Sequence, residues 1–145
     1  MKKDFLVIAV LILLLASCSL NSETQIANFS TPGFEMVVSD RGIISALTDP
    51  ETGINHLAQD SIAPLLSLRV NGIYHNPMSA TSSGDILYLQ FVGQREAQIK
   101  VTKKATYITF ELKALSNPDE VDLVLWGPYP TTIHKIIGEH IYTTP

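Results

Sequence analysis

Four histidines and a limited set of carboxylates are the side chains of this sequence that could do acid–base or metal chemistry. His56, His75, His134 and His140 lie far apart, and no two have the spacing that puts a pair of metal ligands on one element. The sequence therefore predicts no metal site, and we expect no cofactor. It also contains neither a G-x-S-x-G nucleophile elbow nor a glycine-rich phosphate loop.

The carboxylates raise the question of glycoside cleavage, which needs two acids about 5 to 10 Å apart across a cleft. Any antiparallel sheet can bring two acids that close by accident. Nothing in the sequence distinguishes Glu35, Asp85, Glu111 or Asp122 from one another. We therefore assign no catalytic residue and expect a non-catalytic protein, with a small enzyme that uses coupled acids as an alternative.

Cys18 is the only cysteine, so it cannot form an internal disulfide. Lys2 and Lys3 precede the unbroken apolar run Phe5–Ala16, which is shorter than the roughly 20 residues that span a bilayer. The junction Leu15-Ala16-Ser17-Cys18 resembles a bacterial lipobox. We expect residues 1–17 to be a lipoprotein signal peptide, with a signal helix, and Cys18 to carry acyl chains such as palmitate. An ordinary signal peptide with an incidental cysteine, or a short membrane anchor, is the alternative.

Lipidation at Cys18 predicts a membrane partner and a place in the cell envelope, because each buried methylene adds about 0.8 kcal/mol to anchoring. We expect the outer membrane. Residues 18–31 are polar and poor in aromatics, which is typical of a tether. A run of acids after the cysteine would resemble the surface-export signal of gut Bacteroidetes lipoproteins, but only Glu23 is present. The sequence leaves the periplasmic and surface faces equally open.

The segment Trp126-Gly127-Pro128-Tyr129-Pro130 places two large amphipathic rings on a stiff corner. Such rings can stack on the apolar face of a sugar. Trp126, Tyr129 and Tyr74 are therefore the predicted carbohydrate contacts. The alternative is structural, with Trp126 closing the core and Tyr129 covering its edge.

The segments that must position these residues alternate apolar and polar side chains with a period of two from Pro32 onward. This pattern indicates antiparallel strands. Leu66, Leu68 and Val70 alternate with polar residues, and Asn71-Gly72 predicts a tight hairpin that returns through Ile73 and Tyr74. Turns are predicted at 40–42 and 49–53, where aspartate, proline and glycine gather.

The second half continues the same pattern. We predict a flexible loop at 79–84, a central strand at 86–92 buried on both faces, and strands at 97–103, 107–112 and 121–126. A short helix at 133–137 is the one helical segment expected near the C-terminus. Six to eight short strands at this spacing predict an all-β antiparallel β-sandwich over residues 32–145.

Length and charge agree with this organisation. The chain has 145 residues, which suits one domain. Removing residues 1–17 leaves 8 basic and 13 acidic residues, a net charge of −5. Such a domain lacks the basic surface that nucleic acid requires, so we expect no nucleic-acid partner.

The run Val121–Ile133, which contains Trp-Gly-Pro-Tyr-Pro-Thr-Thr, and the following Ile137-Gly138-Glu139 resemble a stretch of large Bacteroidetes lipoproteins. Those proteins resemble glycoside hydrolases, with an N-terminal β-sandwich ahead of a catalytic (β/α)-barrel. Gly42–Leu47 and Ala63–Leu68 are similar to the opening strands of such sandwiches. The resemblance covers roughly residues 33–139.

The resemblance implies a sandwich that is part of a larger galactose-mutarotase-like supersandwich and is incomplete at its C-terminus, because the barrel of the family is missing. No catalytic role is carried onto this chain. We expect a lipid-anchored, non-catalytic module associated with carbohydrate processing or binding. The alternatives are a structural envelope lipoprotein that docks to a protein partner through exposed strand edges, and a truncated fragment of a glycosidase-like lipoprotein.

Overall fold

The structure is a computed structural model that describes residues 23–133. Cys18, the predicted signal peptide and the predicted helix beyond Ile133 lie outside the described residues. Within that range ten strands form three antiparallel sheets, and a single turn of 3₁₀ helix is the one helical element. The described residues thus have the all-β antiparallel fold that the sequence predicts.

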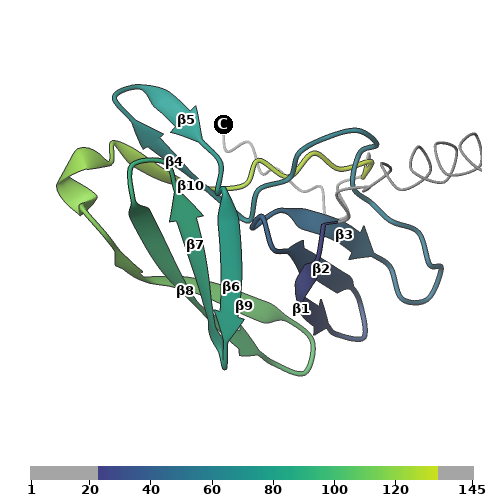
Figure 1. Cartoon of the computed structure of the whole chain (residues 1–145). Helices are drawn as coiled ribbons and strands as arrows, with labels where there is room; N and C mark the ends of the chain where they lie inside the picture. Colours follow the sequence, from purple (N-terminus) through teal and green to yellow (C-terminus); the bar gives the residue numbers. More distant parts are fainter. Residues whose placement is uncertain (1–22, 134–145) are drawn as a thin grey trace, which may run out of the picture.

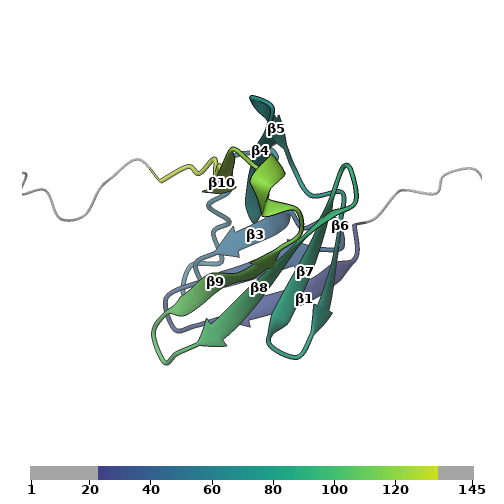
Figure 2. The ribbon, with the colours of Figure 1, turned by 90° about the vertical axis from the view of Figure 1, so that its left-hand side faces the viewer.

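The three sheets form the two layers of a sandwich (Figure 1). The sheet β1–β2–β3 consists of Gln25–Ser30, Glu35–Ser39 and Ile44–Thr48. The sheet β10–β4–β5 consists of Leu123–Trp126, Leu66–Val70 and Ile73–His75. The sheet β6–β7–β8–β9 consists of Ser79–Ser83, Ile86–Phe91, Arg95–Lys103 and Ile108–Leu115, and η1 is Pro118–Glu120. Figure 2 shows this four-stranded sheet in front, with β1 and β3 behind it.

The core lies between the layers and follows the period of two. Alternate residues of β7 and β8 are buried, and they pack against β3, β4 and the segment before β4. Burying each large aliphatic side chain stabilises the fold by roughly 1.5–3 kcal/mol. The fully buried large residues on the two sides are Leu65, Leu66, Leu68, Leu87, Leu89, Phe91 and Ile99.

The predicted Asn-Gly hairpin is confirmed. Asn71 and Gly72 have φ of 50° and 78°, the positive values that this two-residue turn requires. Val70 pairs with Ile73, and Arg69 pairs with Tyr74. The turn therefore fixes the register of β4 and β5.

The predicted loop at 79–84 is wrong, because Ser79–Ser83 forms β6 and pairs along its length with β7. Its small polar residues suit an edge strand whose outward side chains meet solvent. Ala80 is the one buried residue of β6 and packs in the core. The prediction for 86–92 is correct in placing a central strand, but β7 buries only one face completely.

The predicted tether at 18–31 also differs from the structure over β1, Gln25–Ser30. Phe29 and Ala27 pair with Met36 and Val38 of β2 and pack against the core. The polar residues occupy the other face, where the Asn28 amide donates to a Glu35 carboxylate oxygen at 2.6 Å. The polar residues of this segment therefore belong to the solvent-facing side of strand β1 and not to a tether.

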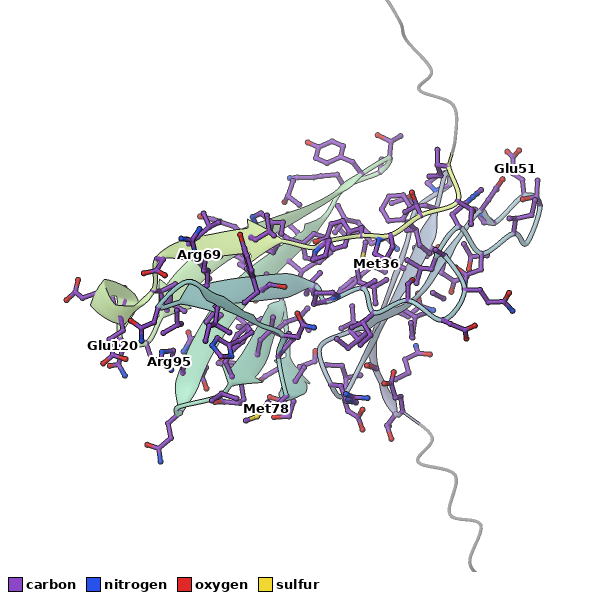
Figure 3. All side chains as sticks on the ribbon, turned by 90° about the horizontal axis from the view of Figure 1, so that it is seen from above. Met36, Glu51, Arg69, Met78, Arg95 and Glu120 are labelled. Atoms are coloured by element: carbon purple, nitrogen blue, oxygen red, sulfur yellow. The ribbon has the colours of Figure 1, made fainter. Side chains whose placement is uncertain are left out.

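The end of the sandwich near η1 is fixed by Arg95 (Figure 3). Its guanidinium donates to the Val92 carbonyl at 2.9 Å and to a Glu120 carboxylate oxygen at 2.5 Å. The Arg95 side chain is only 15% exposed. This contact joins the turn between β7 and β8 to η1, which leads into β10 and the Trp126 corner.

Candidate functional site

The long connection between β3 and β4, residues 49–65, builds the site, and several backbone hydrogen bonds tie it to other segments. At its start, the Thr52 hydroxyl donates to an Asp49 carboxylate oxygen at 2.8 Å, and this hydrogen bond lowers the pKa of Asp49 below its usual value. Further along, the Asn55 side-chain oxygen accepts from the backbone N–H groups of Leu47 and Leu57, both at 3.1 Å. Asn55 therefore holds the connection against β3.

The same connection is also bonded to the chain beyond β10. The backbone N–H of Ala58 donates to the Pro130 carbonyl at 2.9 Å, and that of Thr132 donates to the His56 carbonyl at 2.8 Å. Residues 55–58 thus lie between β3 and residues 130–132. Two segments far apart in the sequence are locked together beside the sheet β1–β2–β3.

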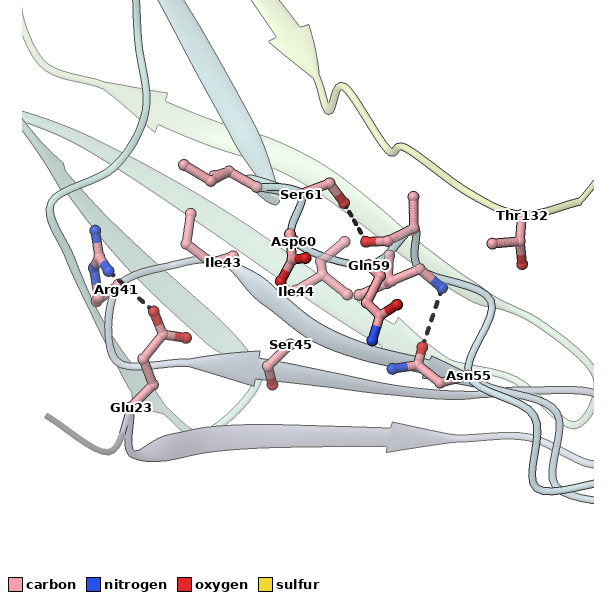
Figure 4. A pocket seen from close by; sticks show the side chains of 13 residues that line it. Glu23, Arg41, Ile43, Ile44, Ser45, Asn55, Gln59, Asp60, Ser61 and Thr132 are labelled. Atoms are coloured by element: carbon pink, nitrogen blue, oxygen red, sulfur yellow. Dashed lines mark hydrogen bonds and ion pairs between the residues drawn. The ribbon is translucent and has the colours of Figure 1, made fainter. Parts of the chain in front are cut away.

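A cleft of about 630 Å³ opens beside this junction (Figure 4). One side comes from the β2–β3 turn and the start of β3, and the other from residues 55–62. The lining residues are Glu23, Arg41, Ile43, Ile44, Ser45, Asn55, Leu57, Ala58, Gln59, Asp60, Ser61, Ile62 and Thr132.

Arg41 reaches the mouth of the cleft from the predicted turn at 40–42. The turn is fixed by Gly42, whose φ is +71° and where an added Cβ would lie 2.8 Å from Cγ of Pro77. The Arg41 guanidinium donates to a Glu23 carboxylate oxygen at 3.1 Å. Since this pair is neutral together, Asp60 supplies the remaining formal charge of the cleft.

The inner cleft combines polar groups with an aliphatic floor. Ile43 and Ile44 form that floor, and Figure 4 shows Gln59 and Asp60 beside it. Asn55 keeps both amide hydrogens available, because its oxygen alone serves the backbone. Amide donors, carboxylate acceptors and apolar surface together can bind a neutral molecule that carries many hydroxyl groups.

The structure brings Trp126 and Tyr129 to one corner. The Trp126 ring is 38% exposed and lies 6.4 Å from the Phe110 ring, centroid to centroid. The Tyr129 hydroxyl donates to the Leu65 carbonyl at 2.7 Å, and burial raises the pKa of Tyr129 to about 12. Both rings therefore make structural contacts, as the alternative in the sequence analysis expects, while part of each stays exposed.

Tyr74 does not join that corner. It pairs with Arg69, whereas Trp126 pairs with Leu66, and these two positions of β4 face opposite sides. Tyr74 and Trp126 consequently lie on opposite faces of the sheet β10–β4–β5. The contact of each ring with carbohydrate stays a prediction, and Tyr74 lies apart from the other two.

The acids considered from the sequence are dispersed among structural contacts, and His134 and His140 lie outside the described residues. Asp122 accepts from the Gly72 backbone N–H at 2.8 Å, while Asp85 and Glu111 pair with Lys100 and Lys113. Among residues 23–133, no group of three or more His, Cys, Asp and Glu side chains could hold a metal ion. The same residues contain no helix long and apolar enough to cross a membrane.

The cleft residues were missed by the sequence analysis. Gln59, Asp60 and Asn55 occupy a connection without periodicity, so nothing in their spacing indicates that they line one cleft with Arg41. The one feature of the sequence that could have indicated this site is the length of the connection, since long loops in compact domains are often functional.

Comparison with family models, with curated proteins and with solved structures gave no match to this chain. The resemblance to the N-terminal sandwich of glycoside-hydrolase-like lipoproteins therefore stays a prediction from the sequence.

Proposed function

We propose that the chain is a lipid-anchored, non-catalytic β-sandwich module that binds carbohydrate, with the cleft beside Arg41 as its site. The observation that supports this most is the lining of the cleft, where Asn55, Gln59 and Asp60 surround an isoleucine floor. A saccharide presents the same combination, with hydroxyls around its ring and an apolar face. The module has Cys18 as its anchor and the outer membrane as its expected location.

The charge of the cleft favours a neutral saccharide over an anionic one. Arg41 is already paired with Glu23, and Asp60 would repel a sugar acid or a phosphate. The cleft volume of about 630 Å³ suits one or two sugar units. We therefore propose a short stretch of a neutral glycan as the ligand.

Calorimetric titration with neutral plant, host and microbial oligosaccharides tests this function. Gln59→Ala is expected to weaken binding about tenfold, as loss of a well-placed hydrogen bond does. Gln25→Ala, which removes an exposed glutamine of β1, is the matched control. No heat with any oligosaccharide, or an equal effect of the two variants, would reject the cleft as the site.

The anchor has its own test. Cells that express the wild-type chain and Cys18→Ala are labelled with a radioactive fatty acid and fractionated. We expect label and membrane recovery for the wild-type chain only. Equal membrane recovery of the two chains without label would contradict the lipoprotein assignment.

The alternative function, docking to an envelope protein, is favoured by one observation. β9 is an eight-residue edge strand, and its inward residues Ile108, Phe110 and Leu112 are only partly buried. A strand from a partner could pair with this edge and cover those side chains. A defined complex recovered from the envelope without any glycan response would favour this function over carbohydrate binding.

A further inference from the structure

The outer face of the four-stranded sheet is a second surface with its own chemistry. Figure 2 looks onto this sheet, and no strand of the other two sheets lies in front of it. Along β7, Leu87 and Leu89 are buried in the core, so Tyr88 between them projects outward. We call the outward-facing residues around this ring, Thr81, Tyr88, Gln90, Glu96 and Gln98, the Tyr88 face.

Tyr88 lies in the middle of a row that crosses the sheet. Its cross-strand partners are Thr81 on β6 and Gln98 on β8, and Gln98 in turn pairs with Ala114 on β9. Directly paired side chains lie about 5 Å apart, and the Tyr88 side chain between these neighbours is partly exposed. The row spans three inter-strand spacings, about 14 Å, which is the length of a short oligosaccharide.

The amides beside the ring are held in place by Glu96. One carboxylate oxygen accepts from the Gln90 amide at 2.5 Å, and the other accepts from the Gln98 amide at 2.9 Å. The Glu96 backbone N–H donates to the Ser116 hydroxyl at 2.6 Å. Each glutamine keeps one N–H and its carbonyl oxygen for a ligand. Because these groups are already oriented, a ligand loses little side-chain entropy on binding.

The outer surface of this sheet has no excess of positive charge. Lys100 stands opposite Glu111 in the ladder, and Lys113 contacts Glu111 at 3.0 Å. With Glu96 and with Asp85, which lies 3.8 Å from the Lys100 ammonium, this side carries two lysines and three acids. A neutral polymer complements such a surface, whereas nucleic acid or an anionic polysaccharide needs an excess of positive charge.

We propose that the Tyr88 face binds an extended, neutral polysaccharide chain that runs across the strands. The Tyr88 ring stacks on one sugar ring, and the Gln90 and Gln98 amides hydrogen-bond to its hydroxyls. This inference rests on the proposed function for the class of ligand, but it assigns a separate surface. The cleft takes a short saccharide, and the Tyr88 face takes the polymer.

Co-sedimentation of the full lipoprotein in detergent with cellulose, chitin and insoluble β-1,3-glucan tests the proposal. Insoluble polygalacturonate provides the anionic comparison. We expect saturable binding to at least one neutral polysaccharide. Tyr88→Ala is expected to weaken it about tenfold, while Tyr88→Phe keeps the ring and most of the binding.

Controls separate this surface from the cleft and from misfolding. Tyr107→Ala removes an exposed tyrosine from the β8–β9 turn, away from the face, and is expected to leave binding unchanged. Gln98→Ala tests the face without touching the ring, so it remains informative if Tyr88→Ala does not fold. Gln59→Ala should weaken the binding of soluble oligosaccharides in the calorimeter about tenfold but leave co-sedimentation unchanged.

Three results would overturn the proposal. They are the absence of sedimentation with every neutral polysaccharide, equal loss of binding in Tyr88→Ala and Tyr107→Ala, and stronger binding to polygalacturonate than to any neutral polymer. In each case the calorimetric test of the cleft still decides the proposed function separately. Conversely, co-sedimentation that depends on Tyr88 without any heat from oligosaccharides would reject the cleft and keep this face.

Discussion

The Trp126 corner and the Tyr88 face both carry exposed aromatic surface, but they differ in what their side chains already do. At the corner, Trp126 packs near Phe110, and Tyr129 donates its hydroxyl hydrogen to the Leu65 carbonyl. On the Tyr88 face, the ring stands beside two glutamines that are oriented by Glu96. At the corner the Tyr129 hydroxyl is committed to the fold, whereas on the face each glutamine keeps an N–H and its carbonyl oxygen for a ligand.

This difference shows that residue type alone is a poor guide to sugar contact. The corner has the composition expected of a carbohydrate site, with tryptophan, tyrosine and two prolines in five residues. Its contacts nevertheless serve β4 and β9. Substitutions at the corner should therefore change stability more than binding, and substitutions on the Tyr88 face should do the reverse.

The largest expected effect on stability is that of Trp126→Ala. Removing a partly buried indole from beside Phe110 should cost about 2 kcal/mol, less than the 3–5 kcal/mol of a fully buried aromatic. Denaturant unfolding measures the loss, and co-sedimentation should stay unchanged. If Trp126→Ala instead lost polysaccharide binding with an unchanged unfolding midpoint, the sugar contact would lie at the corner. The proposed difference between the corner and the Tyr88 face would then be wrong.

Tyr129→Phe is expected to have a smaller effect. It leaves the Leu65 carbonyl without its 2.7 Å donor, which should cost about 1 kcal/mol of unfolding free energy. Tyr107→Phe is the matched control, because that ring is exposed in a turn. An equal, negligible change in both variants would show that the Tyr129 bond contributes nothing measurable.

The pH dependence sharpens the same point. Burial raises the pKa of Tyr129 from 10.0 to about 12, so the folded state binds its proton more tightly than the unfolded state. The stability linked to this proton is complete below pH 10 and is lost as the pH rises to about 12. Unfolding curves at pH 9 to 12 should show wild type losing its advantage over Tyr129→Phe. A constant difference in unfolding free energy between wild type and Tyr129→Phe across that range would contradict a raised pKa of Tyr129.

Gln98→Ala should change stability least. The side chain lies on the solvated side of β8 and bonds only to Glu96, so we expect a change within about 0.5 kcal/mol. Its binding to the neutral polysaccharide should nevertheless fall. A stability loss larger than that of Tyr129→Phe would mean that the amide network on this face is structural, as the corner is.

Much of the fold was predictable, because the alternation of apolar and polar residues and the residue preferences of tight turns depend only on neighbouring residues. Asn71-Gly72 alone fixed a hairpin and its register, and the alternation in β8 correctly placed Ile99 and Val101 in the core. The errors fell on β1 and β6, whose polar residues indicated a tether and a loop. A strand at the edge of a sheet with one solvated face has few apolar residues, so its pairing partner decides its structure.

The candidate sites were less predictable than the fold. Gln59 and Arg41 line the same cleft because residues 55–58 bond to both β3 and residues 130–132. Tyr74 and Trp126 lie on opposite faces because they pair with Arg69 and Leu66, which are three positions apart in β4. A period of two assigns alternate residues to opposite faces, but it does not say which strand lies beside which.

By itself, the sequence determined the all-β class and the tight turns of this protein, because these depend on backbone preferences and on the alternation of apolar residues along each strand. The tertiary structure alone decided which aromatic rings are committed to packing and which polar groups converge. Those outcomes depend on the order and register of strands distant in sequence, where one step along β7 moves a side chain from the core to the outer face of its sheet.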